Sequence, residues 1–269
     1  VVRVREGAPV RVTRVVVEGL DEAPEARARA GRLAIQPGQV FSEEAFDAAR
    51  AQLTAALRAT GWADAAVTQS AQVLPEEGTA KVRYRVEAGA RYRFGRVFVA
   101  GTAAVPRQKV ISQASREVKT GEWFDEGKLD RAQARVFDLG VFAGVRVSRA
   151  ANDTVRNTVP VVVAVREAPF RTLRLGPGVG FQLSRWEAQG LASWTHRNWL
   201  GGLQRLQLDA RAGYAWIPNP IKRQREGLVG QLSAAFSQPS VIGDVIDLSA
   251  KVEVEKGLEQ AYGYVAERD

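Results

Sequence analysis

Residues 11–19 read RVTRVVVEG, and residues 93–101 read RFGRVFVAG. The two stretches lie 82 positions apart, and both end at a glycine. A second pair, GQVFSE at residues 38–43 and GEWFDE at residues 121–126, lies 83 positions apart. Two matches at nearly the same offset indicate a duplicated domain.

Both copies contain the same predicted elements. A strand ends at Gly19 or Gly101, where the chain must turn. A short helix follows, then a loop with a Gly-x-x-Phe signal, a long helix with Ser42 or Asp125 as its N-cap, and two closing strands. The expected short helices span residues 25–33 and 107–113, and the expected closing strands span residues 65–73, 81–86, 144–148 and 159–165. Each copy is therefore predicted to be an α+β unit of the order βααββ.

The two long helices differ in predicted length by about one turn. Apolar residues recur at helical spacing in both of them. These residues are Phe46, Leu53 and Leu57 in the first copy and Leu129, Val136 and Leu139 in the second. The distance from Phe41 to Gly61 is twenty residues, and the distance from Phe124 to Gly140 is sixteen. Because four residues make about one helical turn, the buried face survives the deletion.

The boundaries of the copies follow from a third similarity. Residues 4–8 read VREGA and resemble VEAGA at residues 86–90, where the first copy ends. We therefore expect residues 1–8 to be the last strand of an upstream copy. The two repeats themselves are expected at residues 9–89 and 90–168.

The pattern changes in residues 169–269. Apolar residues there alternate with polar or small ones in runs of about ten, the length that a tilted strand needs to cross a bilayer. The segment contains five runs and the start of a sixth, which predicts the N-terminal strands of an all-β, antiparallel transmembrane barrel. An open edge in lipid leaves backbone groups unpaired, and about eight strands are the usual minimum for closure. We therefore expect the barrel to be incomplete here and to be completed downstream or by another chain.

Aromatic residues near the ends of these runs predict a girdle at the membrane interfaces. The candidate girdle residues are Trp186, Trp194, Trp199, Tyr214 and Trp216. The alternative is a soluble antiparallel sandwich, whose strands also alternate but average only about 5–6 residues. A sandwich would expose no continuous apolar band on Leu173, Leu206, Leu208, Ile246 and Leu248.

Composition excludes several classes of function. The absence of cysteine excludes a disulfide framework, a thiol nucleophile and a thiolate metal site. The single histidine, His196, has no nearby nucleophile, and no metal-ligand spacing is present. We expect no enzymatic activity, no catalytic residue, no metal and no cofactor. The formal net charge is +8, but the arginines alternate with valines in predicted strands and so lie on solvated faces. This spacing argues against a nucleic-acid partner.

The repeats and the strand segment together resemble a known family. Two βααββ units with a Gly-x-x-Phe signal before the long helix, followed by barrel strands, resemble the polypeptide-transport-associated (POTRA) domains of the BamA/TamA superfamily. Residues 173–181, LRLGPGVGF, and residues 196–202, HRNWLGG, resemble the first strand and first turn of such a barrel. The turn is more similar to TamA than to BamA.

The resemblance implies a bacterial outer-membrane protein with periplasmic POTRA domains, which inserts or exports β-barrel or autotransporter-type clients without covalent chemistry. In such proteins the first barrel strand forms a seam, and its edge can template an incoming strand by β-augmentation. The candidate seam residues are Leu173, Leu175, Gly176, Gly178, Val179, Gly180 and Phe181. The glycines fit this role because they weaken a strand and permit bending. Alternatively, they make room inside the barrel or bend an ordinary strand.

The implied partners are unfolded outer-membrane client proteins, outer-membrane lipid, and a periplasmic or inner-membrane protein that binds the POTRA domains. Strand edges such as residues 65–73 could pair with clients or partners, or could simply be solvated or lie between domains. Two alternatives within the superfamily are BamA itself and a two-partner-secretion transporter. An alternative from another class is a soluble periplasmic scaffold with a C-terminal β-sandwich.

Overall fold

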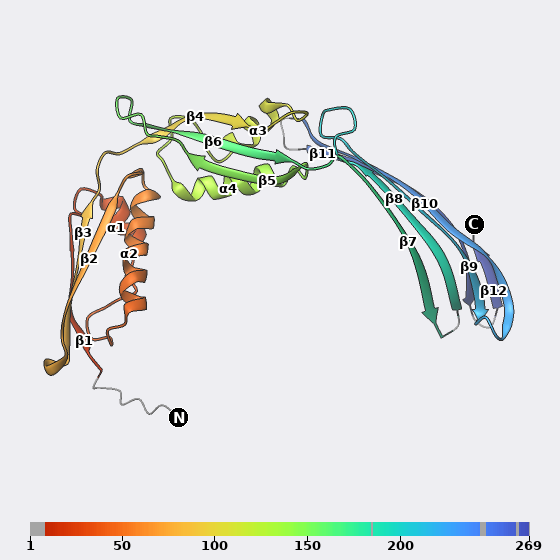
Figure 1. Cartoon of the computed structure of the whole chain (residues 1–269), viewed down its shortest axis with the longest axis horizontal. Coiled ribbons are helices and arrows are strands. Elements are labelled where there is room, and N and C mark those ends of the chain that lie inside the picture. Colours follow the sequence, from red (N-terminus) through yellow and green to blue (C-terminus); the bar gives the residue numbers. More distant parts are fainter. Residues whose placement is uncertain (1–8, 184, 243–245, 262–263, 269) are drawn as a thin grey trace. The chain divides into compact units, whose positions relative to one another are not determined.

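A computed structural model of the chain describes residues 9–183, 185–242, 246–261 and 264–268. The described strands form two three-stranded sheets and one six-stranded sheet (Figure 1). The strand predicted for residues 1–8 lies outside the described residues.

The first repeat is a three-stranded sheet with two helices. Its elements are β1 (Arg11–Glu18), α1 (Pro24–Ala30), α2 (Glu43–Arg58), β2 (Ala66–Leu74), the 3-10 helix η1 (Pro75–Glu77) and β3 (Thr79–Glu87). Strand β3 is central and pairs in parallel with β1 and antiparallel with β2. Both helices lie on the same side of this sheet (Figure 1). The order βααββ predicted for this copy is confirmed.

The core of the first repeat lies between α2 and the sheet. Leu53 and Leu57, predicted from their helical spacing, are fully buried in one cluster with Tyr84. The Tyr84 hydroxyl donates a hydrogen bond to the Phe46 carbonyl at 2.9 Å. Burial, and to a lesser extent the nearby negative charge of Asp47, raises the pKa of Tyr84 to about 12.

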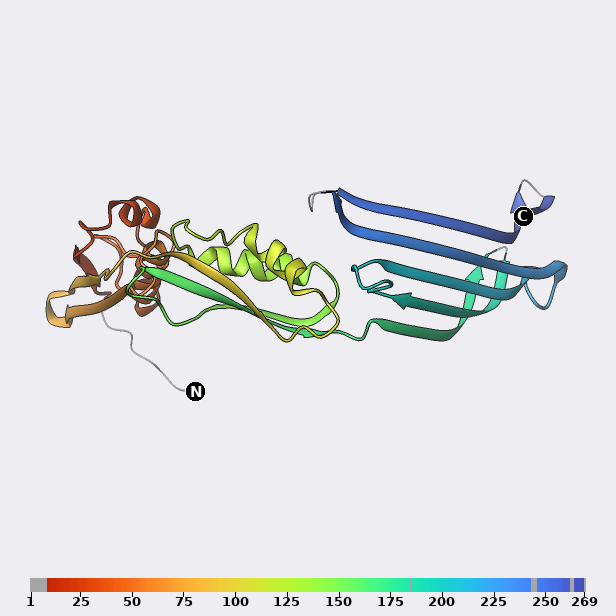
Figure 2. The same ribbon diagram turned by 90° about the horizontal axis from the view of Figure 1, so that it is seen from above.

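The second repeat has the same order of elements. They are β4 (Arg93–Ala100), α3 (Arg107–Ser115), α4 (Glu126–Phe137), β5 (Phe142–Arg149) and β6 (Thr158–Glu167). Strand β6 is central, lies beside β5 and pairs in parallel with β4. Helix α4 runs alongside the strands (Figure 2) and has 12 residues against 16 in α2. The difference of one helical turn predicted from the sequence is confirmed.

Both long helices begin at the side-chain caps that the sequence predicts. The Ser42 hydroxyl accepts a hydrogen bond from the Ala45 amide at 3.2 Å, and Asp125 Oδ1 accepts one from the Gly127 amide at 2.9 Å. These caps satisfy amides that have no partner within the first helical turn. The position of the caps fixes where the Gly-x-x-Phe loop ends and the helix begins.

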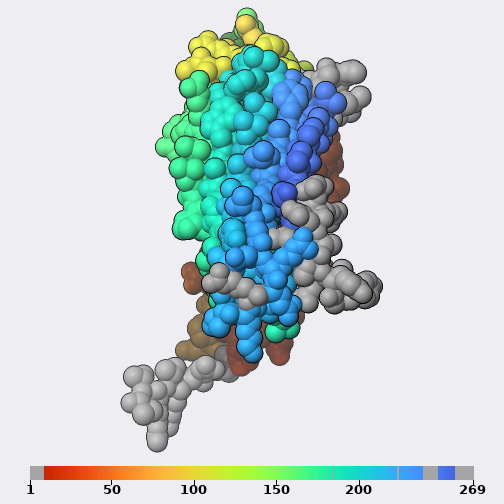
Figure 3. Space-filling model, turned by 90° about the vertical axis from the view of Figure 1, so that its right-hand side faces the viewer, coloured from red at the N-terminus to blue at the C-terminus, as the bar shows by residue number. Residues whose placement is uncertain are grey.

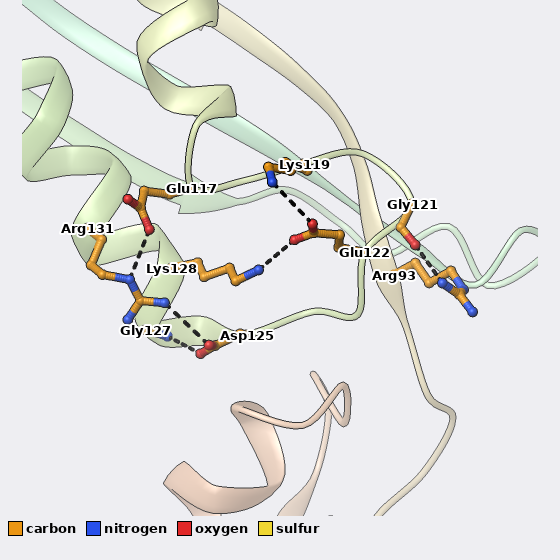
Figure 4. A network of polar contacts seen from close by, with 9 residues as sticks. All are labelled: Arg93, Glu117, Lys119, Gly121, Glu122, Asp125, Gly127, Lys128 and Arg131. Atoms are coloured by element: carbon orange, nitrogen blue, oxygen red, sulfur yellow. Dashed lines mark hydrogen bonds and ion pairs between the residues drawn. The ribbon is translucent and has the colours of Figure 1, made fainter. Parts of the chain in front are cut away.

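Ion pairs connect the loop before α4 to that helix (Figure 4). Glu122 accepts a hydrogen bond from Lys128 Nζ at 2.6 Å, and this bond lowers the pKa of the Glu122 carboxyl. Arg131 lies between two carboxylates, with Nε 3.0 Å from Glu117 and Nη2 3.4 Å from Asp125. The network joins both ends of the loop to the same helix.

The third sheet contains the strands of the C-terminal segment. They are β7 (Arg171–Gln182), β8 (Arg185–His196), β9 (Arg205–Pro218), β10 (Arg223–Ile242), β11 (Ile246–Ala261) and β12 (Tyr264–Arg268). Neighbouring strands are antiparallel. They follow chain order, and the colours change from green to blue across the sheet in Figure 3. The five strands and the start of a sixth predicted from the sequence are confirmed. Strands β7 to β11 have 12 to 20 residues, more than the predicted ten. No helix in the described part of the chain is long and apolar enough to span a membrane.

Candidate functional site

The register divides the six-stranded sheet into two faces. Side chains directly opposite each other on neighbouring strands lie on the same face. One row contains Leu173, Trp194, Leu208, Ala234 and Val252. The next row contains Leu175, Ala192, Ala210, Leu232 and Val254. The face that carries these rows, here called the apolar face, is therefore continuous over five strands.

The apolar face is exposed to the surroundings of the chain. Leu173 is 62% exposed, Leu208 42% and Leu248 55%, while Leu206 is half-buried. The side chain of Ile246 lies outside the described residues. A water-soluble sheet would cover such a band, so its exposure favours contact with lipid over a soluble sandwich.

The opposite face of the sheet is polar and bonded within itself. Asp209 accepts hydrogen bonds from the hydroxyls of Ser193, at 2.6 Å, and Ser233, at 3.4 Å. Arg211 Nη2 lies 3.2 Å from Glu255 Oε1. Alternation of an apolar outer face with a polar inner face is typical of transmembrane barrels.

The predicted girdle residues gather in two clusters near opposite ends of the strands. One cluster contains Trp194, His196 and Trp199, and the other contains Phe181, Trp186, Tyr214 and Trp216. Trp186 and Trp194 are separated by eight residues along β8. This corresponds to about 27 Å along the strand, or about 19–22 Å of height at a tilt of 35–45°. The spacing is close to the height of an apolar membrane band, about 25 Å.

Strand β7 is an edge of the sheet. Among the described residues it pairs only with β8, so the backbone groups along its other side face no strand. The predicted seam residues divide between the two faces. Leu173, Leu175, Val179 and Phe181 lie on the apolar face, and Gly176, Gly178 and Gly180 lie on the polar face.

Two of the three glycines of β7, Gly178 and Gly180, lie beneath longer side chains of β8. A β-carbon at Gly178 would lie 3.1 Å from Gln189 Cγ, and one at Gly180 would lie 3.4 Å from Glu187 Cγ. Gly213 on β9 flanks Gln189 from the other side. These contacts support the alternative that Gly178 and Gly180 make room on the polar face. Gln189 has no signal in the sequence, because its role depends on which strands become neighbours.

The turn between β8 and β9 is held by residues whose role the sequence does not reveal. Asn198 is buried, and its Oδ1 accepts a hydrogen bond from the amide of Leu203, which has a positive φ of 69°. His196 Nδ1 accepts a hydrogen bond from the Asn198 amide at 3.2 Å. The Arg197 amide donates to the Phe170 carbonyl at 2.8 Å and so connects the turn to the start of β7. In the described residues no group of three or more His, Cys, Asp or Glu side chains could hold a metal ion.

Comparison with known families identifies the repeats. The POTRA family model, described as a surface antigen variable number repeat, matches residues 10–89 and 92–168. The chain belongs to the POTRA family. The POTRA match covers both βααββ units, so the resemblance noted from the Gly-x-x-Phe signals is confirmed at the level of the family.

Solved structures resemble this chain to different extents. BamA from Haemophilus ducreyi lacking POTRA domains 1-3 matches with a TM-score of 0.70 and 16% identity, over 94% of this chain and 44% of that chain. BamA POTRA3-5 from Haemophilus influenzae matches with a TM-score of 0.47 and 18% identity, over 59% of this chain and 61% of that chain. CdiB from Acinetobacter baumannii matches with a TM-score of 0.38 and 10% identity, over 95% of this chain and 55% of that chain.

The first match establishes the fold. POTRA repeats are followed by an antiparallel sheet that resembles part of the BamA barrel, which confirms the predicted fold class. This chain spans less than half the length of that BamA chain, 44%. The POTRA family and this fold together support the BamA superfamily without distinguishing its branches.

Proposed function

We propose that the chain belongs to an outer-membrane factor that inserts or exports β-barrel or autotransporter-type clients. The observation that carries the proposal is the six-stranded sheet, with a continuous exposed apolar face and a polar face bonded within itself. It follows two POTRA domains in the chain. In this proposal the POTRA domains lie in the periplasm and the sheet lies in the outer membrane.

The apolar face would contact outer-membrane lipid. Its two aromatic clusters would lie at the two membrane interfaces, where tryptophan and tyrosine are enriched. The polar face would line the inside of the barrel, where Asp209 and Arg211 keep their hydrogen-bonding and ionic partners. Charged groups on that face then carry no cost of exposure to hydrocarbon.

The edge of β7, as the seam of the completed barrel, would act as the template for a client strand. Backbone amides and carbonyls supply the affinity of such pairing, so clients with different side chains can be accepted. No covalent step is required. Within the superfamily, the turn sequence HRNWLGG at residues 196–202 favours a TamA-like member. The POTRA domains would bind a periplasmic or inner-membrane partner.

Single cysteines can test the lipid contact, because the chain has none of its own. Leu208→Cys lies on the apolar face, and Gln207→Cys lies next to it on the polar face of β9. After refolding into phospholipid vesicles, each is labelled with a polarity-sensitive fluorophore. We expect a blue-shifted signal and quenching by a lipid-bound quencher at position 208 only. Water-like signals at both positions would instead favour the soluble scaffold.

A second pair of cysteines tests the template role of β7. Leu175→Cys on the edge strand and Ala210→Cys on the interior strand β9 lie in the same row of the apolar face. A client with one cysteine in its terminal strand is offered to each variant in vesicles under oxidising conditions. We expect a mixed disulfide with position 175 at least ten times more often than with position 210. Equal yields, or none at position 175, would refute templating at this edge.

A further inference from the structure

Two arginines lie beside each other where the six-stranded sheet begins. Arg171 is the first residue of β7 and pairs in register with His196, the last residue of β8. Arg197 follows His196, and its amide donates a hydrogen bond to the carbonyl of Phe170, the residue before Arg171. Arg171 is two positions before Leu173 on the strand and therefore lies on the apolar face. The backbone thus brings two arginines to one end of the sheet.

Neither arginine has an anionic partner within the sheet. Arg171 is exposed and Arg197 is half-buried. In the part of the chain that the structure describes, neither guanidinium forms an ion pair with a carboxylate. The neighbours of Arg171 in its own row are His196, Leu206 and Phe236, and the next row is apolar. The positive charge at this end of the apolar face therefore attracts an external anion.

An aromatic cluster marks the level of the arginines in the membrane. The Trp199 ring lies almost at right angles to the rings of Trp194 and His196, with centroids 5.7 Å and 5.4 Å away. Trp199 is 39% exposed, and Leu200 beside it is 80% exposed. Tryptophans of transmembrane barrels gather at the level of the lipid headgroups. Because Arg171 lies opposite His196, it is placed at that level too.

A hollow of about 450 Å³ lies in the apolar face beside this level. Short side chains create it, because they stand between larger ones in the rows that begin at Leu173 and Leu175. Its lining includes Leu173, Ala192, Trp194, Leu208, Ala210 and Leu232. Leu173 is two positions from Arg171, about 6.6–6.8 Å along the strand. An acyl chain that fills the hollow gains dispersion contacts on every side, within reach of the arginines.

We propose that this end of the apolar face binds one acidic phospholipid, with its phosphate at Arg171 and Arg197 and one acyl chain in the hollow. A guanidinium matches the geometry of a phosphate and binds it through two parallel hydrogen bonds. The hollow is lined by residues of β7, β8 and β9 as well as of the strands that follow. The lipid therefore contacts the edge strand β7 together with its neighbours.

The charge of the site specifies the lipid. A zwitterionic headgroup brings its own cation, which competes with the arginines for the phosphate, whereas an acidic headgroup keeps a net negative charge. The inference rests on the proposed function, because it requires the apolar face to lie in lipid. Strand β7 follows the second POTRA domain in the chain, so the site belongs to the periplasmic leaflet.

Native mass spectrometry of the full chain tests the preference for the headgroup. The chain is refolded into vesicles with equal amounts of phosphatidylglycerol and phosphatidylcholine of identical acyl chains, and is then released in mild detergent. We expect one phosphatidylglycerol molecule to stay bound in preference to phosphatidylcholine. Arg171→Gln/Arg197→Gln should weaken this retention at least about ten-fold. Arg174→Gln/Arg205→Gln, an equal charge change at exposed positions of the polar face, should leave it unchanged.

Substitutions in the hollow test the acyl chain. Ala192→Leu fills the hollow and should lower the retention of phosphatidylglycerol, whereas Ala188→Leu, on the same strand and face but outside the hollow, should not. Free glycerol phosphate should not displace the lipid, and circular dichroism should stay native in every variant. Equal retention of the two lipids, equal weakening by the control pair, or displacement by glycerol phosphate would overturn the proposal. A lipid-like signal at position 208 would then leave the proposed function standing, while a water-like signal there would remove both.

Discussion

Gly101 lies directly against the carbonyl oxygen of Val165, so that a β-carbon at position 101 would overlap with that oxygen. Its φ is +90°, a conformation that residues with a side chain rarely adopt. Gly19 stands in the same relation to the carbonyl oxygen of Val86 in the first repeat. In both POTRA domains, the position after the first strand therefore has no room for a β-carbon.

We expect Gly101→Ala to lower the free energy of unfolding of the second repeat by more than about 3 kcal/mol, because left-handed strain and steric overlap add. The matched control is Gly121→Ala. Gly121 also has a φ of +90°, but its β-carbon would meet nothing within 4 Å, so the loss should be about 1–2 kcal/mol. Hydrogen exchange of the amides of β6 in the full chain measures both losses. Equal losses would show that backbone conformation alone, and not the Val165 carbonyl, decides the cost.

The Glu167 carboxylate accepts hydrogen bonds from three consecutive backbone amides at 2.8–3.2 Å. The donors are Ala103, Ala104 and Val105. Burial alone would raise the pKa of Glu167, but the three amide hydrogen bonds outweigh it and lower the pKa. The ionised Glu167 carboxylate therefore stabilises the fold at pH values above about 4.5, its pKa in the unfolded chain. This stabilisation is lost as the pH falls through the lower pKa that Glu167 has in the folded chain.

Glu167→Gln should cost about 1–3 kcal/mol of unfolding free energy at pH 7 and flatten the dependence of stability on pH below about 4.5. Glu87→Gln, at the corresponding exposed position of the first repeat, should change neither. Urea denaturation between pH 3 and pH 7 compares the variants. An unchanged acid dependence in Glu167→Gln would contradict the assigned role of the carboxylate.

The stability of the first repeat should fall at alkaline pH because of Tyr84. Its pKa is raised to about 12, above the ordinary value of 10.0. The folded state therefore holds the phenolic proton more tightly, and the stability that this supplies below pH 10 is lost as the pH rises toward 12. Tyr84→Phe should lack this dependence and lose about 0.5–1.5 kcal/mol at pH 7 with the hydrogen bond to the Phe46 carbonyl. Thermal melting between pH 8 and pH 11 measures the difference, and parallel curves for the two proteins would refute it.

Two glycines that flank Gln189 in the six-stranded sheet, Gly178 and Gly213, should respond differently to substitution. A β-carbon at Gly178 would lie nearest to the flexible Gln189 side chain, whereas one at Gly213 would lie 2.6 Å from the Ala188 carbonyl oxygen. Gly213→Ala should therefore destabilise the sheet by about 1–3 kcal/mol, and Gly178→Ala by less. Adding Gln189→Ala should relieve Gly178→Ala and leave Gly213→Ala impaired. Unfolding temperatures in detergent test this order, and the reverse order would exclude the assigned contacts.

Much of the fold follows from local patterns. The caps at Ser42 and Asp125, the apolar spacing in the long helices and the alternation after residue 169 each depend on residues within one turn or one strand. Such interactions form between chain neighbours, so the sequence contains them directly. The strands are longer than the alternation predicts, because pairing in a sheet continues past the point where the alternation weakens.

The candidate sites needed more than local patterns. Residue type and position along the strands predict the seam and girdle residues. Gln189 and Asn198 have no such signal, because each acts on a residue that only the folded turn or sheet brings near.

The amino-acid sequence is enough to predict the duplication, the order of elements in each repeat, the length difference of the two long helices and the number of strands in the C-terminal segment. These are properties of periodicity, and periodicity is set by residues close along the chain. The folded chain is needed to establish which strands are edges, which glycines lie beneath a neighbouring side chain and which charges share a face. Those features depend on pairing between distant segments, and a shift of one residue in register would move every side chain of a strand to the opposite face.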